Sequence, residues 1–302
     1  MQRVAPKNRP HPYLLWPLVC VGITAISFAS ILIRLADAPS LSIATYRVGL
    51  ASLILLPYCS FRLPVGPSKW NGRLLMATVL SGFFLALHFA FWVRSLQMTT
   101  VASSTTLVST TPLFVAVFSH LFLGEHLPTR SWIGILLVLI GSGFIAGEDF
   151  GFSQEALLGD LFALAGALAA SGYLLAGQFV RRHLHLAAYT LGSYGSAALL
   201  LLAFGTLTSV PLSGFSNQTY LMLILLAIIP QLIGHTTFNW TLKFLSPTAV
   251  AVLILGEPIG ATVLAYLFFG EVLPIQKALG LLVLGSGIVL SAEASSVPST
   301  NA

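Results

Sequence analysis

Charge is scarce in this sequence. Only 8% of its 302 residues are charged, whereas a soluble domain carries about 25%. With so few charged residues, a folded soluble protein of this length could not cover its surface with the charged groups that keep it hydrated. Hydrophobic residues make up 56% of the chain, and its mean hydropathy is +0.91. The composition therefore argues against a soluble globular domain and predicts an integral membrane protein.

Cysteines and catalytic motifs are also scarce. The two cysteines, Cys20 and Cys59, lie in or beside apolar runs, where a free cysteine packs as a small apolar side chain. The sequence has no H-E-x-x-H, G-x-S-x-G or G-x-x-x-x-G-K-[ST] motif. We therefore expect neither a metal nor another cofactor, and neither an intramembrane enzyme nor an ATP-driven pump.

Basic residues outnumber acidic ones, giving a formal net charge of +5, but they are scattered between apolar runs. Scattered Lys and Arg are typical of the cytoplasmic loops of a membrane protein. We therefore expect the lipid bilayer and a small molecule as partners, and no nucleic acid.

Long apolar runs are abundant. A membrane helix needs about 20 mostly apolar residues, and unbroken runs exclude the alternating pattern of a β-barrel. We predict an all-α integral membrane protein with ten transmembrane helices, at about 13–33, 41–60, 72–96, 101–123, 131–147, 158–180, 187–208, 218–242, 247–269 and 276–292.

The distribution of Lys and Arg predicts the orientation. If the chain starts in the cytoplasm and the ten helices alternate, ten Lys and Arg residues fall inside and three fall outside, as the positive-inside rule requires. The first apolar run is too long for a signal peptide. We expect a protein of the cell inner membrane with both termini in the cytoplasm, including short tails at 1–12 and 294–302.

One block of sequence recurs. Residues 111–134 (TPLFVAVFSHLFLGEHLPTRSWIG) match residues 257–280 (EPIGATVLAYLFFGEVLPIQKALG) at a fixed offset of 146. The ten helices then divide into two five-helix repeats, 13–147 and 158–292. Because five is odd, the second repeat must cross the membrane in the opposite sense. Such inverted repeats are typical of secondary transporters.

Two short segments, 141–143 and 285–287, both read Gly-Ser-Gly. Small residues let membrane helices approach closely, so we expect tight helix contacts there, either within one subunit or between two. A monomer and a weak homodimer both fit this pattern.

The repeated blocks, the five helices per half and Arg47 in the second helix resemble the drug/metabolite transporter superfamily, and within it the EamA-type ten-helix members. The resemblance covers about 13–292. It implies a transporter, commonly an exporter of amino acids or other small metabolites, like the aromatic amino-acid exporters of the YddG kind. It does not identify the solute, because members move very different molecules. Glu257 departs from the duplication, since Thr111 holds the equivalent place.

Polar residues form a stripe on the eighth predicted helix. Gln231, His235 and Asn239 follow at intervals of four, which puts them on one face of an α-helix. Polar groups in a membrane helix avoid lipid, so we expect this stripe to face a cavity. Hydrogen bonding between helices is the alternative. Pro230 removes a backbone donor and is expected to bend the helix.

Two other helices offer cavity residues. His88 and Trp92 share a face of the third predicted helix, and His88 lies within one position of the equivalent of His235. Ser109 and Thr111 lie in the middle of the fourth. We expect these residues to border the same cavity, with packing between helices as the alternative.

Two charged residues lie more than one helical turn from either end of a predicted helix. Glu257 is about 15 Å from either end of the ninth, where an unpaired carboxylate favours its protonated form. We predict that Glu257 couples transport to protons or binds a substrate amine, with a structural hydrogen-bonded carboxyl as the alternative. Arg47 is expected to be structural, snorkelling to the interface or pairing with a group such as Asp37. Alternatively, it holds a substrate carboxylate.

The inverted repeats and the polar residues predict a secondary active transporter of small molecules that works by alternating access, and the family resemblance implies that it exports small metabolites. Neutral amino acids, aromatic ones included, are favoured, because Glu257 and Arg47 supply the charges and Trp92, Phe84 and Tyr46 could stack on a side chain. A transporter of another class, such as drugs or nucleotide-related solutes, is one alternative. A membrane channel is another, and it is disfavoured because the polar residues cluster at mid-depth.

Overall fold

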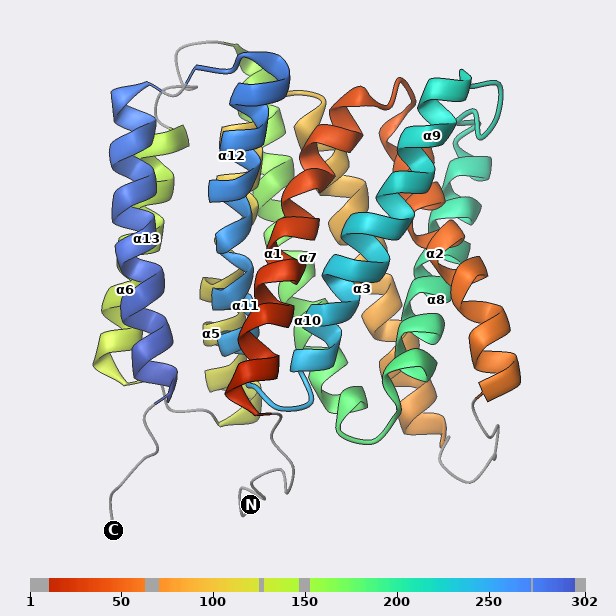
Figure 1. The fold of residues 1–302 in the computed structure, drawn as a ribbon, viewed down its shortest axis with the longest axis horizontal. Coiled ribbons are helices and arrows are strands. Elements are labelled where there is room, and N and C mark those ends of the chain that lie inside the picture. The colour runs from red at the N-terminus through yellow and green to blue at the C-terminus, as the bar shows by residue number, and fades with distance from the viewer. Residues whose placement is uncertain (1–10, 63–70, 125–127, 147–152, 273, 297–302) are drawn as a thin grey trace.

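The structure is a bundle of helices (Figure 1). This computed structural model describes residues 11–62, 71–124, 128–146, 153–272 and 274–296, and every regular element in these residues is helical. The elements are α1 (Pro12–Leu35), α2 (Ser40–Arg62), α3 (Gly72–Leu96), α4 (Val101–Val108), α5 (Thr111–Leu123), α6 (Thr129–Ala146), α7 (Gln154–Arg181), α8 (Leu186–Leu207), α9 (Asn217–Leu226), η2 (Ala227–His235), α10 (Thr236–Thr241), α11 (Pro247–Ile254), α12 (Gly256–Phe269) and α13 (Ile275–Ser296).

The helices suit a membrane. Among the described residues, eight helical segments are long and apolar enough to cross one, and two shorter apolar segments, Thr129–Phe144 and Ala278–Gly287, belong to α6 and α13. Large apolar side chains such as Phe61, Leu121 and Leu207 are exposed, as lipid-facing residues are. The prediction of an all-helical membrane protein is confirmed.

The fourth and ninth predicted membrane helices coincide with two of the candidate spans, Val101–Phe122 and Pro247–Phe269, but each is interrupted part-way along. Residues 109–110 interrupt the first run between α4 and α5, and Leu255 interrupts the second between α11 and α12. Each downstream helix carries a proline in its first turn, Pro112 or Pro258. A proline is tolerated there because the first backbone N–H groups of a helix have no intrahelical partner. The two breaks therefore share one physical cause.

The downstream helices also end alike. Gly124 follows α5 and Gly270 follows α12, with φ of 64° and 66°. Glycine adopts this left-handed conformation without a steric penalty. The two glycines stand 146 residues apart, at the offset found in the sequence.

The eighth apolar run changes its winding at Pro230. It begins as α9, widens into the π-helix η2, and ends as α10. Proline cannot donate to the carbonyl one turn earlier, which disturbs the α-helical hydrogen bonds. A bend was predicted here, and the structure instead accommodates Pro230 in a segment of π-helix.

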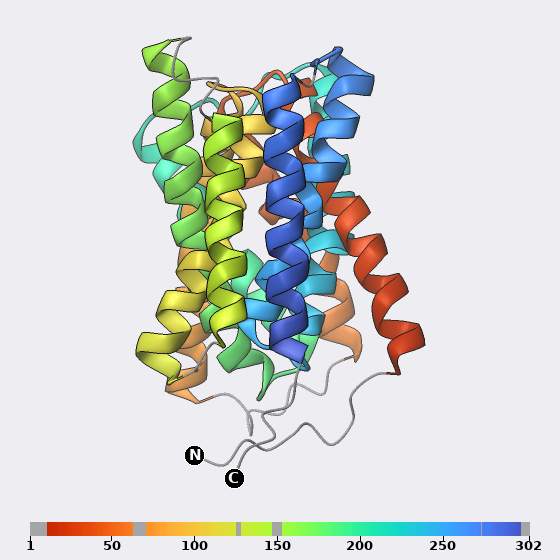
Figure 2. The same ribbon diagram turned by 90° about the vertical axis from the view of Figure 1, so that its left-hand side faces the viewer.

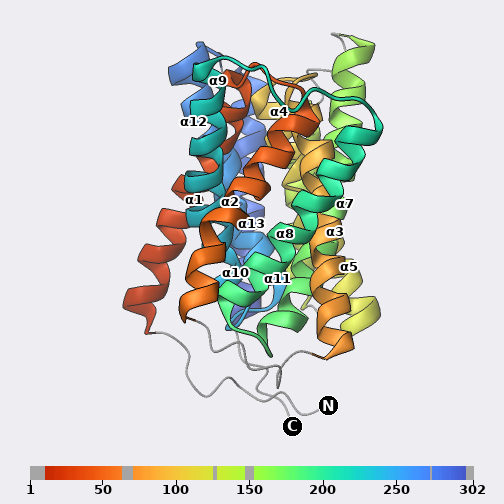
Figure 3. The ribbon, with the colours of Figure 1, turned by 90° about the vertical axis from the view of Figure 1, so that its right-hand side faces the viewer.

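Helices that stand 146 residues apart pack together at the two ends of the bundle. Figure 2 shows α6 and α13 side by side, and Figure 3 views the opposite end, where α2 contacts α8. Gly141 of α6 lies against the backbone of Gly280, and Gly287 of α13 lies against Gly134. The later residue of each helix thus meets the earlier residue of the other, so α6 and α13 run antiparallel.

The α2–α8 contact has the same reciprocal form. Gly49 faces Ala198, and Gly195 faces Ser52. At the offset of 146, Gly49 is equivalent to Gly195 and Ser52 is equivalent to Ala198, so each residue of α2 contacts the equivalent of the other. The close contacts of Gly141 and Gly287 therefore lie within one chain.

Gly287→Ala should destabilise the protein. A Cβ atom at position 287 would collide with the backbone of Gly134, and backbone cannot rotate aside, so we expect a loss of about 1–3 kcal/mol. The melting temperature of the purified protein in detergent measures this loss. Gly285→Ala is the control, because a Cβ there would meet nothing within 4 Å. Equal melting temperatures for the two variants would contradict the close crossing.

Candidate functional site

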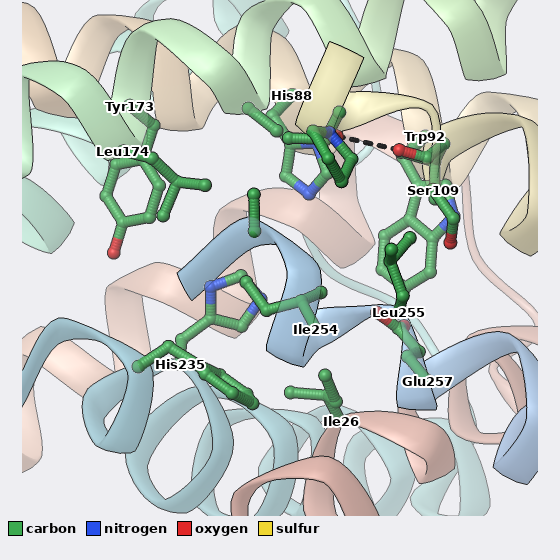
Figure 4. Close-up of a pocket in the computed structure, with 16 residues that line it drawn as sticks. Ile26, His88, Trp92, Ser109, Tyr173, Leu174, His235, Ile254, Leu255 and Glu257 are labelled. Atoms are coloured by element: carbon green, nitrogen blue, oxygen red, sulfur yellow. Dashed lines mark hydrogen bonds between the residues drawn. The ribbon is translucent and has the colours of Figure 1, made fainter. Parts of the chain in front are cut away.

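A pocket lies in the interior of the bundle (Figure 4). The centre of a water-sized molecule can reach about 50 Å³ of its interior. Its wall draws on α1, α3, α4, α5, α7, η2, α10, α11 and α12, and on both helix breaks. Segments from both ends of the sequence therefore enclose one cavity.

Six of the eight residues predicted to border a cavity line this pocket, and two do not. Gln231 and Asn239 lie behind the wall, where both are fully buried. The stripe on the eighth helix thus avoids lipid as predicted, but only His235 reaches the pocket. The residues that line it are His88, Trp92, Ser109, Thr111, His235 and Glu257.

Glu257 enters the pocket because the ninth run is broken. It stands in the first turn of α12, where the unpaired N–H groups of a helix start favour negative charge. The residue is 9% exposed, and its carboxyl group accepts no hydrogen bond from the described part of the chain. The acceptor oxygens are therefore free to bind a donor in the pocket.

The break between α4 and α5 contributes two hydroxyl groups. The Ser109 hydroxyl donates to the Thr105 carbonyl at 2.6 Å, and the Thr111 hydroxyl donates to the Val108 carbonyl at 2.7 Å, the dashed line in Figure 4. Both hydroxyl protons are used within the local backbone. These residues therefore offer mainly acceptor oxygens to a solute.

Aromatic rings form much of the remaining wall. His88 stacks on Trp92 with 5.8 Å between ring centroids and an interplanar angle of 10°, and its centroid is 6.4 Å from that of His235. His88 Nδ1 lies 3.0 Å from the Gly166 carbonyl oxygen. No cluster of three metal-ligating side chains occurs among the described residues. The two histidines therefore contribute flat, partly polar surfaces.

Arg47 does not snorkel, and that expectation was wrong. Its side chain is fully buried, and Nε donates to Gln231 Oε1 at 2.8 Å. The guanidinium carbon lies 4.1 Å from the Phe89 ring centroid, within cation–π range. No ion pair with Asp37 forms. The amide of Gln231 and the face of Phe89 hold the cation in the bundle interior.

Asn239 serves interhelical hydrogen bonding. Its Oδ1 accepts from the Tyr173 hydroxyl at 2.7 Å, and its Nδ2 donates to the Tyr194 hydroxyl at 3.1 Å. The Tyr194 hydroxyl also lies 3.2 Å from Thr236 Oγ1. This network joins α7, α8 and α10 behind the pocket wall and stabilises the position of Tyr173.

Sequence reasoning missed Tyr173 and Phe238, which both line the pocket. Tyr173 stands in a run of small and apolar residues on α7, and a lone aromatic side chain there was the available signal. Two aromatic residues expected near the solute lie elsewhere. Phe84 packs against Gly172, and the Tyr46 hydroxyl donates to the Leu212 carbonyl at 2.8 Å.

A bundle of apolar helices around an interior, partly polar pocket defines a multi-pass membrane protein suited to small molecules. The chain belongs to the EamA-like transporter family, whose model matches residues 11–147 and again 157–292. The family resemblance seen in the repeated blocks is thus confirmed.

Individual relatives agree with the family. An uncharacterized transporter of Archaeoglobus fulgidus is 26% identical over 278 residues, covering 90% of this chain and 94% of its own. The uncharacterized transporter YxxF of Bacillus subtilis is 25% identical, covering 74% of this chain and 71% of its own. The pseudopaline exporter CntI of Pseudomonas aeruginosa is 27% identical, with 72% and 73% covered. The chain is therefore a membrane transporter and not an enzyme.

A solved crystal structure shows the same fold. It aligns with a TM-score of 0.74 at 18% identity, over 95% of this chain and 100% of that chain.

Tyr173→Phe should destabilise the protein. Removing the hydroxyl leaves the buried Asn239 Oδ1 without its donor, which costs about 1–3 kcal/mol. Thermal unfolding in detergent measures the change, and Tyr266→Phe is the control because Tyr266 is 59% exposed. If both variants melt like the parent protein, the Tyr173–Asn239 bond contributes nothing to stability.

Proposed function

We propose that the protein is a secondary active transporter that exports small metabolites, foremost neutral amino acids including aromatic ones, by alternating access. In this proposal ten transmembrane helices form two inverted repeats, 13–147 and 158–292. The protein lies in the cell inner membrane with both termini in the cytoplasm, and one chain is sufficient because it builds the whole pocket.

Three observations support the inverted arrangement. The family model matches the chain twice, in 11–147 and 157–292. The helix breaks before α5 and α12 fall at equivalent positions. The helices α6 and α13 stand 146 residues apart and pack antiparallel against each other, and so do α2 and α8. Two similar halves of opposite orientation make the inward-open and outward-open states nearly equivalent.

The orientation has independent support. α1 begins and α13 ends at the same end of the bundle (Figure 1), as an even number of crossings requires. The excess of Lys and Arg in loops on that side favours the cytoplasm.

The observation that carries the proposal is the pocket between the two repeats. His88, Trp92 and Thr111 come from one repeat, and His235 and Glu257 from the other. A relative movement of the halves would therefore open this cavity to one side or the other. Binding at the interface of two repeats is the arrangement that alternating access uses.

The lining favours an amine with an apolar or aromatic side chain. Glu257 is the acidic side chain of the lining, and its carboxyl group suits an ammonium. Tyr173, Trp92 and Phe238 offer aromatic faces that stack on rings and attract cations. A relative being named an exporter of pseudopaline supports export of a small metabolite.

Counterflow in proteoliposomes tests this function. Vesicles holding purified protein are loaded with a pool of unlabelled amino acids, and uptake of radiolabelled L-phenylalanine and L-leucine is followed with and without an imposed pH gradient. We expect saturable uptake that depends on the internal pool and is driven further by the gradient. Linear uptake at open-pore rates, or none for any member of the pool, would contradict the proposal.

Glu257→Gln should abolish transport driven by the pH gradient while leaving expression intact. If the carboxyl group carries the coupling proton, exchange without a gradient persists in this variant. If it binds the substrate amine, exchange is lost as well, so the two assays separate the two roles. Glu271→Gln is the matched control, since Glu271 lies outside the pocket and pairs with Arg34 at 3.6 Å. Normal gradient-driven transport by Glu257→Gln would rule out both roles.

A further inference from the structure

Several buried hydrogen-bond donors near the pocket have no partner. Both terminal nitrogens of Arg47, Nη1 and Nη2, lack a hydrogen bond, as do Gln231 Nε2 and Trp92 Nε1. Arg47 and Gln231 are fully buried, and Trp92 is 2% exposed. Buried polar groups without partners are uncommon because each one costs free energy, and a group of them in one place calls for an explanation.

The side chains that carry these unpaired donors, Arg47, Gln231 and Trp92, lie close together. Gln231 Oε1 accepts from Arg47 Nε at 2.8 Å, and the Trp92 ring centroid is 5.7 Å from the Arg47 guanidinium carbon. The orientation of the Gln231 amide follows from this bond, because its nitrogen cannot accept a hydrogen bond. Every free polar atom in the group is therefore a donor.

A set of N–H donors around a permanent cation matches an anion. A carboxylate accepts hydrogen bonds at both oxygens and pairs with guanidinium through two parallel bonds. The described part of the chain supplies no carboxylate in contact with Arg47. Arg47 and Glu257, both within the described residues, form no ion pair. An unpaired buried cation is costly, so an external anion would stabilise it.

The group lies directly behind the pocket. Trp92 contacts Arg47 on one side and lines the pocket on the other. A change in the position of this one side chain would connect the guanidinium to the cavity that Glu257 borders. The two opposite charges would then flank a single bound molecule.

We infer that Arg47, Gln231 and Trp92 form an anion subsite that binds the carboxylate of the transported solute, while Glu257 faces its amine. Arg47 supplies the charge, and Gln231 orients it. This inference rests on the proposed transport function and narrows the solutes to zwitterions that carry both groups. It also replaces the structural role predicted for Arg47.

Paired probes test the subsite. Counterflow is measured for radiolabelled L-phenylalanine and L-phenylalaninamide, which share an amine and a ring but differ in the carboxylate. A charge-assisted pair predicts exchange of the acid about tenfold or more faster than that of the amide. Equal rates would overturn the anion subsite and leave the transport function standing. Exchange of neither probe, nor of L-leucine, would mean that the transport proposal has failed and the inference with it.

Two variants test whether Arg47 and Gln231 cause the preference for the acid over the amide. Arg47→Gln removes the charge and should bring the acid to amide ratio near one. Gln231→Glu places an internal carboxylate beside Arg47, so it should slow exchange of the acid about tenfold or more while raising the melting temperature. This second variant keeps the test valid if Arg47→Gln fails to fold. Gln97→Glu is the control for the substitution, because Gln97 is exposed and donates only to the Ala38 carbonyl.

Three further outcomes support or overturn the anion subsite. Loss of both probes in equal proportion in Gln231→Glu would point to a structural role for Arg47 and overturn the subsite. Exchange of the amide that requires chloride, compared with isethionate, would show that a free inorganic anion occupies the group, which contradicts a solute carboxylate. A ratio that falls in both Arg47→Gln and Gln231→Glu, with Gln97→Glu unchanged, would support the inference.

Discussion

The cost of an unpaired polar group inside hydrocarbon governs this structure. Lipid cannot bond free backbone groups or solvate charge, so irregular backbone and ionisable side chains are confined to the bundle interior. The two helix breaks obey this constraint, because both face the pocket. Arg47 and Glu257 obey it too, since both point inward and neither is more than 9% exposed. The fold therefore places irregular backbone and ionisable side chains at or beside the pocket, away from lipid.

Much of the fold could be predicted from the sequence, because a run of about 20 apolar residues has few alternatives to a membrane helix. The repeated block also made Gly124 equivalent to Gly270, and each of these glycines ends a helix in the left-handed conformation. The helix breaks were missed because Pro112 and Pro258 lie inside apolar runs, and hydropathy does not register the start of a new helix. The π-helix at Pro230 was missed because proline predicts a disturbance but not its form.

The sequence predicted which polar residues lie in the bundle interior better than it predicted which of them line the pocket. Polar residues such as His88 and Glu257 had to avoid lipid, and both reach the pocket. Spacing alone could not separate His235, which lines the cavity, from Gln231 and Asn239, which bond to Arg47 and Tyr173 behind it. That distinction depends on the partners supplied by other helices. Arg47 was misjudged for the same reason, since Gln231 and Phe89 are distant from it in sequence.

The central claim is that one interior cavity is reached from each side of the membrane in turn. A variant with Ser109→Cys, and with Cys20 and Cys59 replaced by Ser, tests it directly, because Ser109 lines the pocket. A membrane-impermeant thiol reagent is applied to right-side-out and to inverted vesicles, with and without transported solute. The account predicts that the thiol reacts from both sides and that solute slows both reactions. Reaction from one side alone, or rates unaffected by solute, would contradict it.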